Sequence, residues 1–114
     1  MTIIIVIMTG RRPFELVYDP KVKAHLRAID SKYYSLIRTT LEEQLRFEPD
    51  IETRNRKPLQ RQVEFEATWE LRFGPDNRFR ALYDVNHARH EVEILAVGVK
   101  ERNRLLVGGE EIKL

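Results

Sequence analysis

The sequence contains no cysteine, and only three of its 114 residues are histidine. Without cysteine there is neither a disulfide framework nor a thiolate zinc site. His25, His87 and His90 are scattered and lack the spacing that a set of metal ligands needs. The sequence therefore predicts no metal and no cofactor, and the absence of disulfides favours a cytoplasmic protein.

Long apolar runs are also missing. The longest, Ile3–Met8, is far shorter than the roughly 20 residues that span a bilayer. It lacks the preceding charged segment and the following cleavage site of a secretory signal, so no membrane partner is predicted. Because unpaired β-branched runs favour aggregation, we expect either an additional strand or a start at Met8 instead of Met1. Residues 1–12 are then an extension outside the core of the domain.

The charge of the chain is nearly balanced. Twenty basic and 18 acidic residues leave a formal net charge of +2, which does not by itself indicate a nucleic-acid partner. A hydrophobic content of 42% suits one compact core, so residues 1–114 are predicted to form a single domain. Only local clustering of basic residues can indicate a binding surface. Such clusters occur at Arg54, Arg56, Lys57 and Arg61, and at Lys100, Arg102 and Arg104.

Residues 63–73 alternate strictly between apolar and polar side chains. The apolar positions are Val63, Phe65, Ala67, Trp69, Leu71 and Phe73. This period of two predicts a strand with one buried and one solvent-facing side. Gly74–Asn77 then form a turn, and residues 78–85 continue the same pattern in a second strand.

The alternation restricts the register of this hairpin. Pairing that keeps the apolar faces together sets Arg72 opposite either Arg78 or Arg80. Like charges that face each other destabilise a sheet by about 0.2–1 kcal/mol, so we expect an anion between the guanidinium groups. Phosphate suits the planar guanidinium fork. The alternative is that the arginines are neutralised by strand carboxylates, from Glu64, Glu66 and Glu70.

The N-terminal half of the sequence predicts a strand and two helices. Phe14–Tyr18 alternates as a strand, and Asp19 before Pro20 starts a short helix. Asp30 caps a second helix, which ends before Pro49. The apolar stripes of these helices consist of Val22, Leu26 and Ile29, and of Tyr34, Ile37, Leu41 and Leu45.

The remaining segments complete an α+β domain. Residues 48–62 are predicted to be a polar, basic loop, and Glu91–Gly98 a strand covered on both faces. Lys100–Leu106 is predicted to be a helical turn or an irregular segment. The expected fold is an N-terminal strand, a helical hairpin and a three-strand antiparallel meander with a short C-terminal segment. The helices cover one face of the sheet.

In this topology three basic groups converge on the other face of the sheet. They are residues 54–57, the pair formed by Arg72 with Arg78 or Arg80, and Lys100 near the tip of the hairpin. The result is a positively charged groove sized for a phosphate backbone. No serine–histidine pair and no paired carboxylates offer acid–base chemistry. RNA carries its own nucleophile, the 2′-hydroxyl, so cations that stabilise charge on phosphorus could suffice.

The chain resembles the RelE/ParE superfamily of toxins from bacterial toxin–antitoxin modules. The resemblance extends roughly from Phe14 to Glu111. It is carried by Phe14–Tyr18, Leu41–Pro49, Arg56–Leu59, Trp69–Arg72, Arg78–Tyr83 and Ala96–Arg102. It implies a compact sheet with a helical hairpin, and an antitoxin of a type II system that wraps the toxin and blocks its basic groove.

The resemblance further implies a ribosome-dependent endoribonuclease that cuts messenger RNA without a metal. Its catalytic positions fall on Arg72, Arg80 and Lys100. Nucleic-acid binding falls on the surrounding cations, Arg54, Arg56, Lys57, Arg78 and Arg102.

Two positions depart from the nuclease pattern. Leu106 stands where such nucleases carry a tyrosine that helps to activate the 2′-hydroxyl, and Glu70 stands where they carry a second strand lysine. The resemblance therefore also admits a ParE-like toxin that inhibits DNA gyrase without cutting RNA. A third alternative is an inactive member that only binds its antitoxin.

Overall fold

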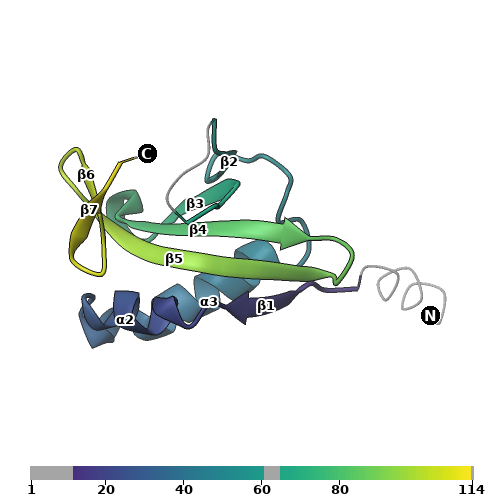
Figure 1. Cartoon of the computed structure of the whole chain (residues 1–114), viewed down its shortest axis with the longest axis horizontal. Helices are drawn as coiled ribbons and strands as arrows, with labels where there is room; N and C mark the ends of the chain where they lie inside the picture. The colour runs from purple at the N-terminus through teal and green to yellow at the C-terminus, as the bar shows by residue number, and fades with distance from the viewer. Residues whose placement is uncertain (1–11, 61–64, 114) are drawn as a thin grey trace.

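The structure is a computed structural model that describes residues 12–60 and 65–113. Within these residues a sheet is covered on one face by helices, as the sequence predicts (Figure 1). The strands are β1 (Glu15–Tyr18), β2 (Arg56–Pro58), β3 (Trp69–Phe73), β4 (Phe79–Asn86), β5 (Glu91–Glu101), β6 (Arg104–Val107) and β7 (Glu110–Ile112). The helices are α2 (Lys21–Arg27) and α3 (Tyr34–Leu45), with short 3₁₀ turns η1 (Ser31–Tyr33) and η2 (Pro75–Asn77).

Aspartate side chains start the helical segments where the sequence predicts. Asp19 Oδ1 accepts a hydrogen bond from the backbone N–H of Lys21, the first residue of α2, at 2.8 Å. Asp30 Oδ1 accepts from the backbone N–H of Lys32 at 3.0 Å, in the 3₁₀ turn that leads into α3. Each bond satisfies one of the free N–H groups at a helix start. None of the helices in the described segments is long and apolar enough to cross a membrane.

The sheet has the order β2–β3–β4–β5–β6–β7, with antiparallel neighbours throughout. β1 lies parallel to the first part of β5, on the same edge that β6 occupies further along (Figure 1). The last two strands of the predicted meander, β4 and β5, pair with Val85 opposite Val92. The eleven-residue strand β5 therefore pairs with β1, β4 and β6.

The predicted strand limits are wrong at the start of the hairpin. β3 begins at Trp69, whereas the alternation predicts Val63; residues 65–68 are not a strand, and Glu66 has a left-handed φ of 60°. Val63 and Glu64 lie outside the described residues. The predicted loop 48–62 instead contains β2, which pairs with β3. A strand of three residues that ends in proline offers no alternation to detect.

A second correction concerns the region after the meander. Instead of a helical turn, β5 continues to Glu101, turns through Arg102 and Asn103, and returns as β6. Gly108 and Gly109, both with positive φ, then turn the chain into β7. The meander is therefore longer than the three strands predicted, and the C-terminal segment belongs to the sheet.

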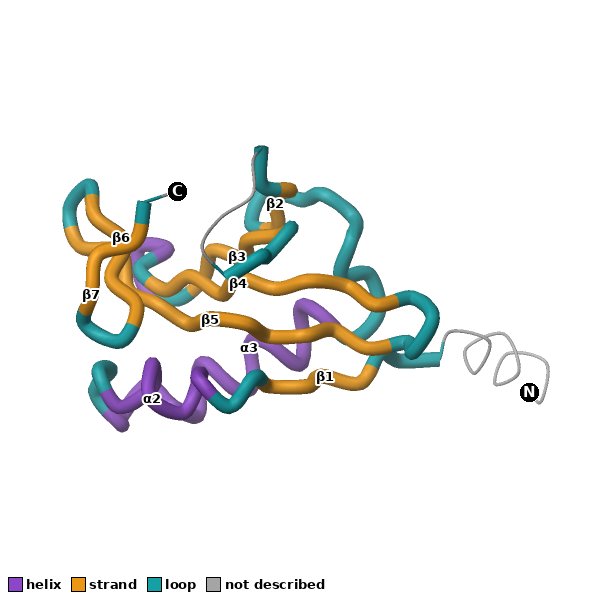
Figure 2. The backbone as a smooth tube through the Cα atoms, in the orientation of Figure 1, coloured by secondary structure: helices purple, strands orange, loops and turns teal. Residues whose placement is uncertain are grey.

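Each face of the sheet carries its own apolar cluster. The larger lies between the sheet and the helices and includes Ile37, Leu41, Leu71, Phe79 and Tyr83. The smaller lies on the opposite face, where β6 and β7 curl over the end of the sheet (Figure 2). Its buried residues are Ala67, Leu82, Ala96, Leu105, Val107 and Ile112. The rest of that face is polar, and it contains the candidate site.

Candidate functional site

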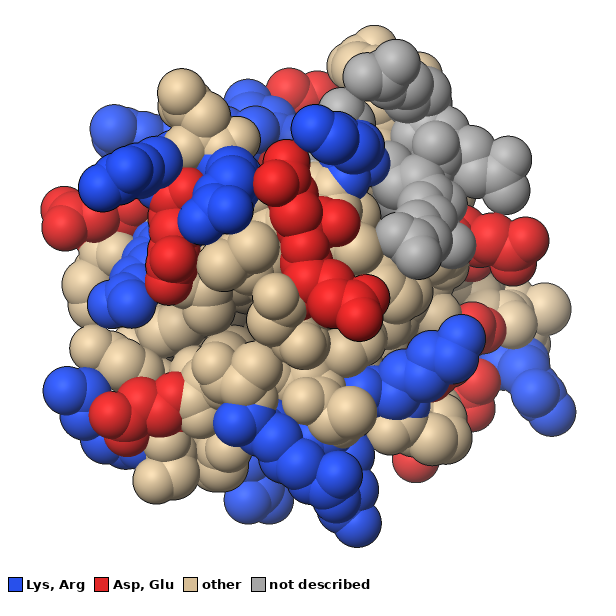
Figure 3. Space-filling model, turned by 60° about the vertical axis from the view of Figure 1, so that its left-hand side comes forward, with Lys and Arg blue, Asp and Glu red and all other residues tan. Residues whose placement is uncertain are grey.

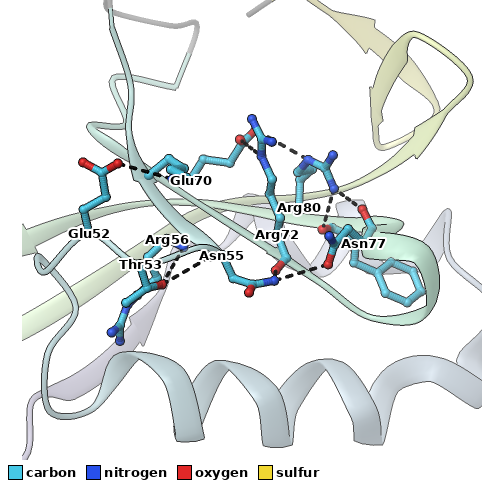
Figure 4. A network of polar contacts seen from close by, with 10 residues as sticks. Glu52, Thr53, Asn55, Arg56, Glu70, Arg72, Asn77 and Arg80 are labelled. Atoms are coloured by element: carbon cyan, nitrogen blue, oxygen red, sulfur yellow. Dashed lines mark hydrogen bonds and ion pairs between the residues drawn. The ribbon is translucent and has the colours of Figure 1, made fainter.

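Two arginines face each other on the side of the sheet away from the helices. Arg72 of β3 pairs directly with Arg80 of β4, which is the second of the two predicted registers. Their neighbours on the same strands, Leu71 and Ala81, point into the helix-side core. Figure 4 shows Arg72 and Arg80 projecting from the sheet away from α3. The alternation of the hairpin thus places both guanidinium groups on the open face, as predicted.

The anion between these guanidinium groups is a carboxylate of the protein itself. Glu70 Oε1 lies 2.8 Å from Arg72 Nε, and Glu70 Oε2 lies 3.7 Å from Arg80 Nε (Figure 4). The Glu70 and Arg80 side chains are 4% and 7% exposed, whereas Arg72 is 46% exposed. The sequence allowed two interpretations, an anion bound between the arginines or neutralisation by a strand glutamate. Glu70 neutralises them in the structure, as in the second interpretation. A phosphate at this place would share the guanidinium groups with Glu70.

Arg80 is fixed from its other end as well. Its Nη1 donates to the backbone oxygen of Asn77 and, at 3.2 Å, to that of Phe79. Burial lowers the pKa of Arg80 and Arg72 lowers it further, while Glu70 opposes both. An arginine remains charged despite such a shift, because a guanidinium group does not lose its proton in a protein. Arg80 is therefore a permanently charged, oriented donor.

A groove of about 560 Å³ lies over this pair. It is lined by the cations Lys57, Arg72, Arg80, Lys100 and Lys113 and by the carboxylates of Glu70 and Glu111. Most of these cations have a partner: Lys57 lies 3.3 Å from Glu52, and Lys113 lies 3.2 Å from Glu111. Figure 3, which brings the β6–β7 end of the molecule forward, likewise shows acidic side chains among basic ones. Nearby carboxylates therefore neutralise most of the positive charge in the groove.

A second, smaller hollow adjoins the groove at the tip of the β3–β4 hairpin. This hairpin-tip hollow measures about 440 Å³ and is lined by Pro75, Asp76, Asn77, Arg78, Arg80, Lys100 and Arg102. The backbone N–H of Lys100 donates to the carbonyl of Arg78 at 2.7 Å, which confirms the predicted position of Lys100 beside the tip. Arg80 and Lys100 line both the groove and the hollow.

The predicted basic loop is only partly in the groove. Lys57 pairs with Glu70 in the register of β2 and β3 and lies at the groove wall. Arg56 points to the other face, where its Nη1 donates to the carbonyl of Gln44 in the last turn of α3 at 2.5 Å. A cation at that end satisfies a free carbonyl and the negative end of the helix dipole. Arg54 is exposed and lines neither hollow.

Sequence reasoning missed Asn55, which ties three parts of the site together. Its Nδ2 donates to the carbonyl of Arg72 at 2.8 Å and to Asn77 Oδ1 at 3.3 Å, and its carbonyl accepts from the N–H of Arg72 at 2.8 Å (Figure 4). Nothing in the local sequence marks this residue. The partner role of Glu70, by contrast, follows from its position two residues before Arg72 on the same face of a strand.

The ionisable side chains that the structure places around the two hollows are lysine, arginine, aspartate and glutamate. No histidine, tyrosine, serine or cysteine is among the described residues that line them. Leu106 pairs with Val99 in the β5–β6 ladder, next to the pair formed by Lys100 and Leu105. Lys100 and Leu105 line the groove, and because side chains alternate along a strand, Leu106 faces the other side of the sheet. The described residues also contain no cluster of three potential metal ligands. The site can hold an anion and stabilise negative charge, but it offers no imidazole or phenol for proton transfer.

Comparison with known proteins rests on structure alone, because no protein-family profile and no curated protein sequence matches. A chain in the crystal structure of the RelBE2 toxin–antitoxin complex from Mycobacterium tuberculosis superposes with a TM-score of 0.60. The match covers 77% of this chain and 99% of that one. The chain has a RelE-like fold. At 24% sequence identity this likeness concerns the fold. The RelE-like fold confirms the α+β architecture that the sequence predicts.

Proposed function

We propose that the protein is the toxin of a type II toxin–antitoxin system and acts on messenger RNA in the ribosome. The observation that carries this proposal is the convergence of Arg72, Arg80 and Lys100, from three neighbouring strands, on one groove. The RelE-like fold supports a toxin, since the structural neighbour is a toxin–antitoxin complex. The partners are a cognate antitoxin that covers the groove and the message itself, both in the cytoplasm.

The proposed reaction is endonucleolytic cleavage without a metal. The 2′-hydroxyl of RNA gives its proton to water and attacks the adjacent phosphorus, and the P–O5′ bond breaks. The products are a 2′,3′-cyclic phosphate and a 5′-hydroxyl, whose oxygen takes a proton from water. The three cations stabilise the negative charge that develops on the phosphoryl oxygens. Removing one such donor typically lowers a rate by a factor of about 10²–10³. Because the groove offers no imidazole or phenol, charge stabilisation carries the catalysis in this proposal.

Growth arrest upon induced expression provides the test. Arg80→Ala and Lys100→Ala should both relieve the arrest; Lys100 is exposed, so its removal leaves the fold intact. Arg89→Ala, in the exposed turn at the far end of the sheet, is the matched control and should remain toxic. Primer extension should find new ends within codons for the wild type and for Arg89→Ala, but not for Arg80→Ala or Lys100→Ala. A folded Lys100→Ala variant that still cuts message at the wild-type rate contradicts the proposal.

Glu70 favours a second candidate function, a toxin that binds without cutting. Its carboxylate already occupies the space between Arg72 and Arg80. Such a protein would inhibit DNA gyrase or would bind only its antitoxin. Induction would then leave message intact; a gyrase inhibitor would change plasmid supercoiling, and an inactive member would have no effect on growth.

A further inference from the structure

Three of the four cations that line the hairpin-tip hollow have no carboxylate partner in the described part of the chain; the fourth, Arg80, is shared with the groove and lies 3.7 Å from Glu70. Among the described residues, Arg78, Lys100 and Arg102 form no ion pair, and Asp76 is the one carboxylate in the lining. In the groove, by contrast, every cation except Lys100 lies within 4 Å of a glutamate. Of the two hollows, the one at the hairpin tip therefore has more unpaired cations.

Hydrogen bonds link the chain segments that carry these cations. The hydrogen bond from Lys100 N to Arg78 O joins the end of β5 to the tip of the β3–β4 hairpin. Arg80 is anchored by the carbonyls of Asn77 and Phe79, and Asn55 fastens Asn77 to the loop before β2. Arg80, whose side chain these bonds hold, loses little conformational entropy when it binds an anion.

Left-handed backbone conformations also gather around this hollow. Asp76, Asn77 and Arg102 have φ values of 54°, 51° and 57°, and all three line it. Aspartate and asparagine tolerate this region, but arginine does so at a cost of roughly 1–2 kcal/mol. Arg102 stands in the two-residue turn between Glu101 and Arg104, where glycine would be unstrained. A charged side chain retained at a strained position points to a functional use of that charge.

We infer that the hairpin-tip hollow binds a backbone phosphate of single-stranded RNA and supplies most of the RNA affinity of the free protein. This inference rests on the proposed RNA substrate and assigns a separate binding site to it. Arg80 and Lys100 are shared with the groove, so a strand that fills the hollow continues directly past Arg72. In the groove, Glu70 already neutralises part of the positive charge. The groove cations then mainly stabilise the negative charge that develops on the phosphate during the reaction.

The test compares variants that affect one hollow at a time. Binding of a short fluorescein-labelled oligouridylate to the purified protein is followed by anisotropy over a range of salt concentrations. Arg78→Gln and Arg102→Gln, which line only the hairpin-tip hollow, should each weaken binding about five- to tenfold and reduce the salt slope by about 0.7. Arg72→Gln, which affects only the groove, should cause a smaller loss; Lys23→Gln on α2 is the control outside both sites.

Two further variants separate charge from structure. Arg102→Gly removes the charge together with the strained φ, so it should raise the melting temperature while it weakens RNA binding. Glu70→Gln should tighten binding, and in that background Arg72→Gln should become as costly as Arg78→Gln. A purely structural role of Arg102 predicts unchanged RNA affinity in the glycine variant.

Several outcomes would overturn the inference. The first is a greater loss of RNA affinity from Arg72→Gln than from Arg78→Gln and Arg102→Gln. The second is an absence of RNA binding by the wild type. The third is tighter binding of poly-glutamate than of RNA at the same residues. The last outcome would assign the hollow to an acidic polypeptide. The assay uses no ribosome and no cleavage. If Arg78 and Arg102 carry RNA binding while message stays intact, the nuclease proposal fails and the binding site stands.

Discussion

The two faces of the sheet use alternate residues of the same strands for opposite purposes. On the helix side, Leu71, Ala81 and Tyr83 are fully buried in an apolar core. On the open side, Glu70, Arg72 and Arg80 form an ionic network of graded exposure. Neighbouring positions thus contribute either packing or charge. The comparison shows that positions one residue apart on the same strand differ completely in what surrounds them, an apolar core on one face and ion pairs on the other.

The largest effect is expected on the helix face. Leu71→Ala removes a side chain with no exposed surface from the centre of the core, and should lower the free energy of unfolding by about 2–5 kcal/mol. Urea denaturation measures the change. Leu36→Ala, on the exposed side of α3 where 40% of the side chain is accessible, is the control and should change little.

On the open face, a comparable loss is expected from removal of Glu70, one of the two nearly buried members of the ionic network. Glu70→Ala leaves the nearly buried guanidinium of Arg80 without its carboxylate, and should cost about 3 kcal/mol. Arg72→Ala, which removes the exposed partner of the same carboxylate, should cost less than about 1 kcal/mol. Denaturation curves of the two variants can be compared directly; equal losses would contradict the graded network.

The helix face should also respond to pH. Burial lowers the pKa of His25, an effect that Asp19 opposes, and the ring Nδ1 lies 3.4 Å from the backbone N–H of Val97. Because the unfolded chain binds this proton at higher pH than the folded chain, the free energy of unfolding falls as pH drops through the ordinary histidine pKa. The loss stops below the folded pKa. Urea midpoints above and below that range should differ less in His25→Gln, and an unchanged difference would exclude His25 as the cause.

The smallest effect is expected at the groove wall. The Lys57–Glu52 ion pair is exposed on both sides, so Lys57→Gln should change the free energy of unfolding by less than about 0.5 kcal/mol. Thermal denaturation at low and high salt provides the measurement. A larger loss, or one that persists at high salt, would indicate that Lys57 also supports the β2–β3 pairing.

Much of this arrangement was predictable from local patterns. The alternation of the hairpin predicted that Arg72 faces another arginine, and aspartates marked the starts of both helical segments. The groove cations Arg72, Arg80 and Lys100 do converge. The two short strands β2 and β7 were missed, because three residues cannot display a period. Arg56 was placed on the wrong face for the same reason, since its side follows from its pairing with Leu71.

Side-chain periodicity by itself determined the fold class, the apolar face that the hairpin turns toward the helices and the opposition of two arginines, because each of these follows from the alternation or periodicity of local elements. The tertiary structure decided which anion lies between those arginines and where charge remains unbalanced. Glu70 fills the space beside Arg72 and Arg80, while Arg78, Lys100 and Arg102 meet at the hairpin tip from separate elements. Such contacts depend on distances across the sheet, which no local pattern encodes.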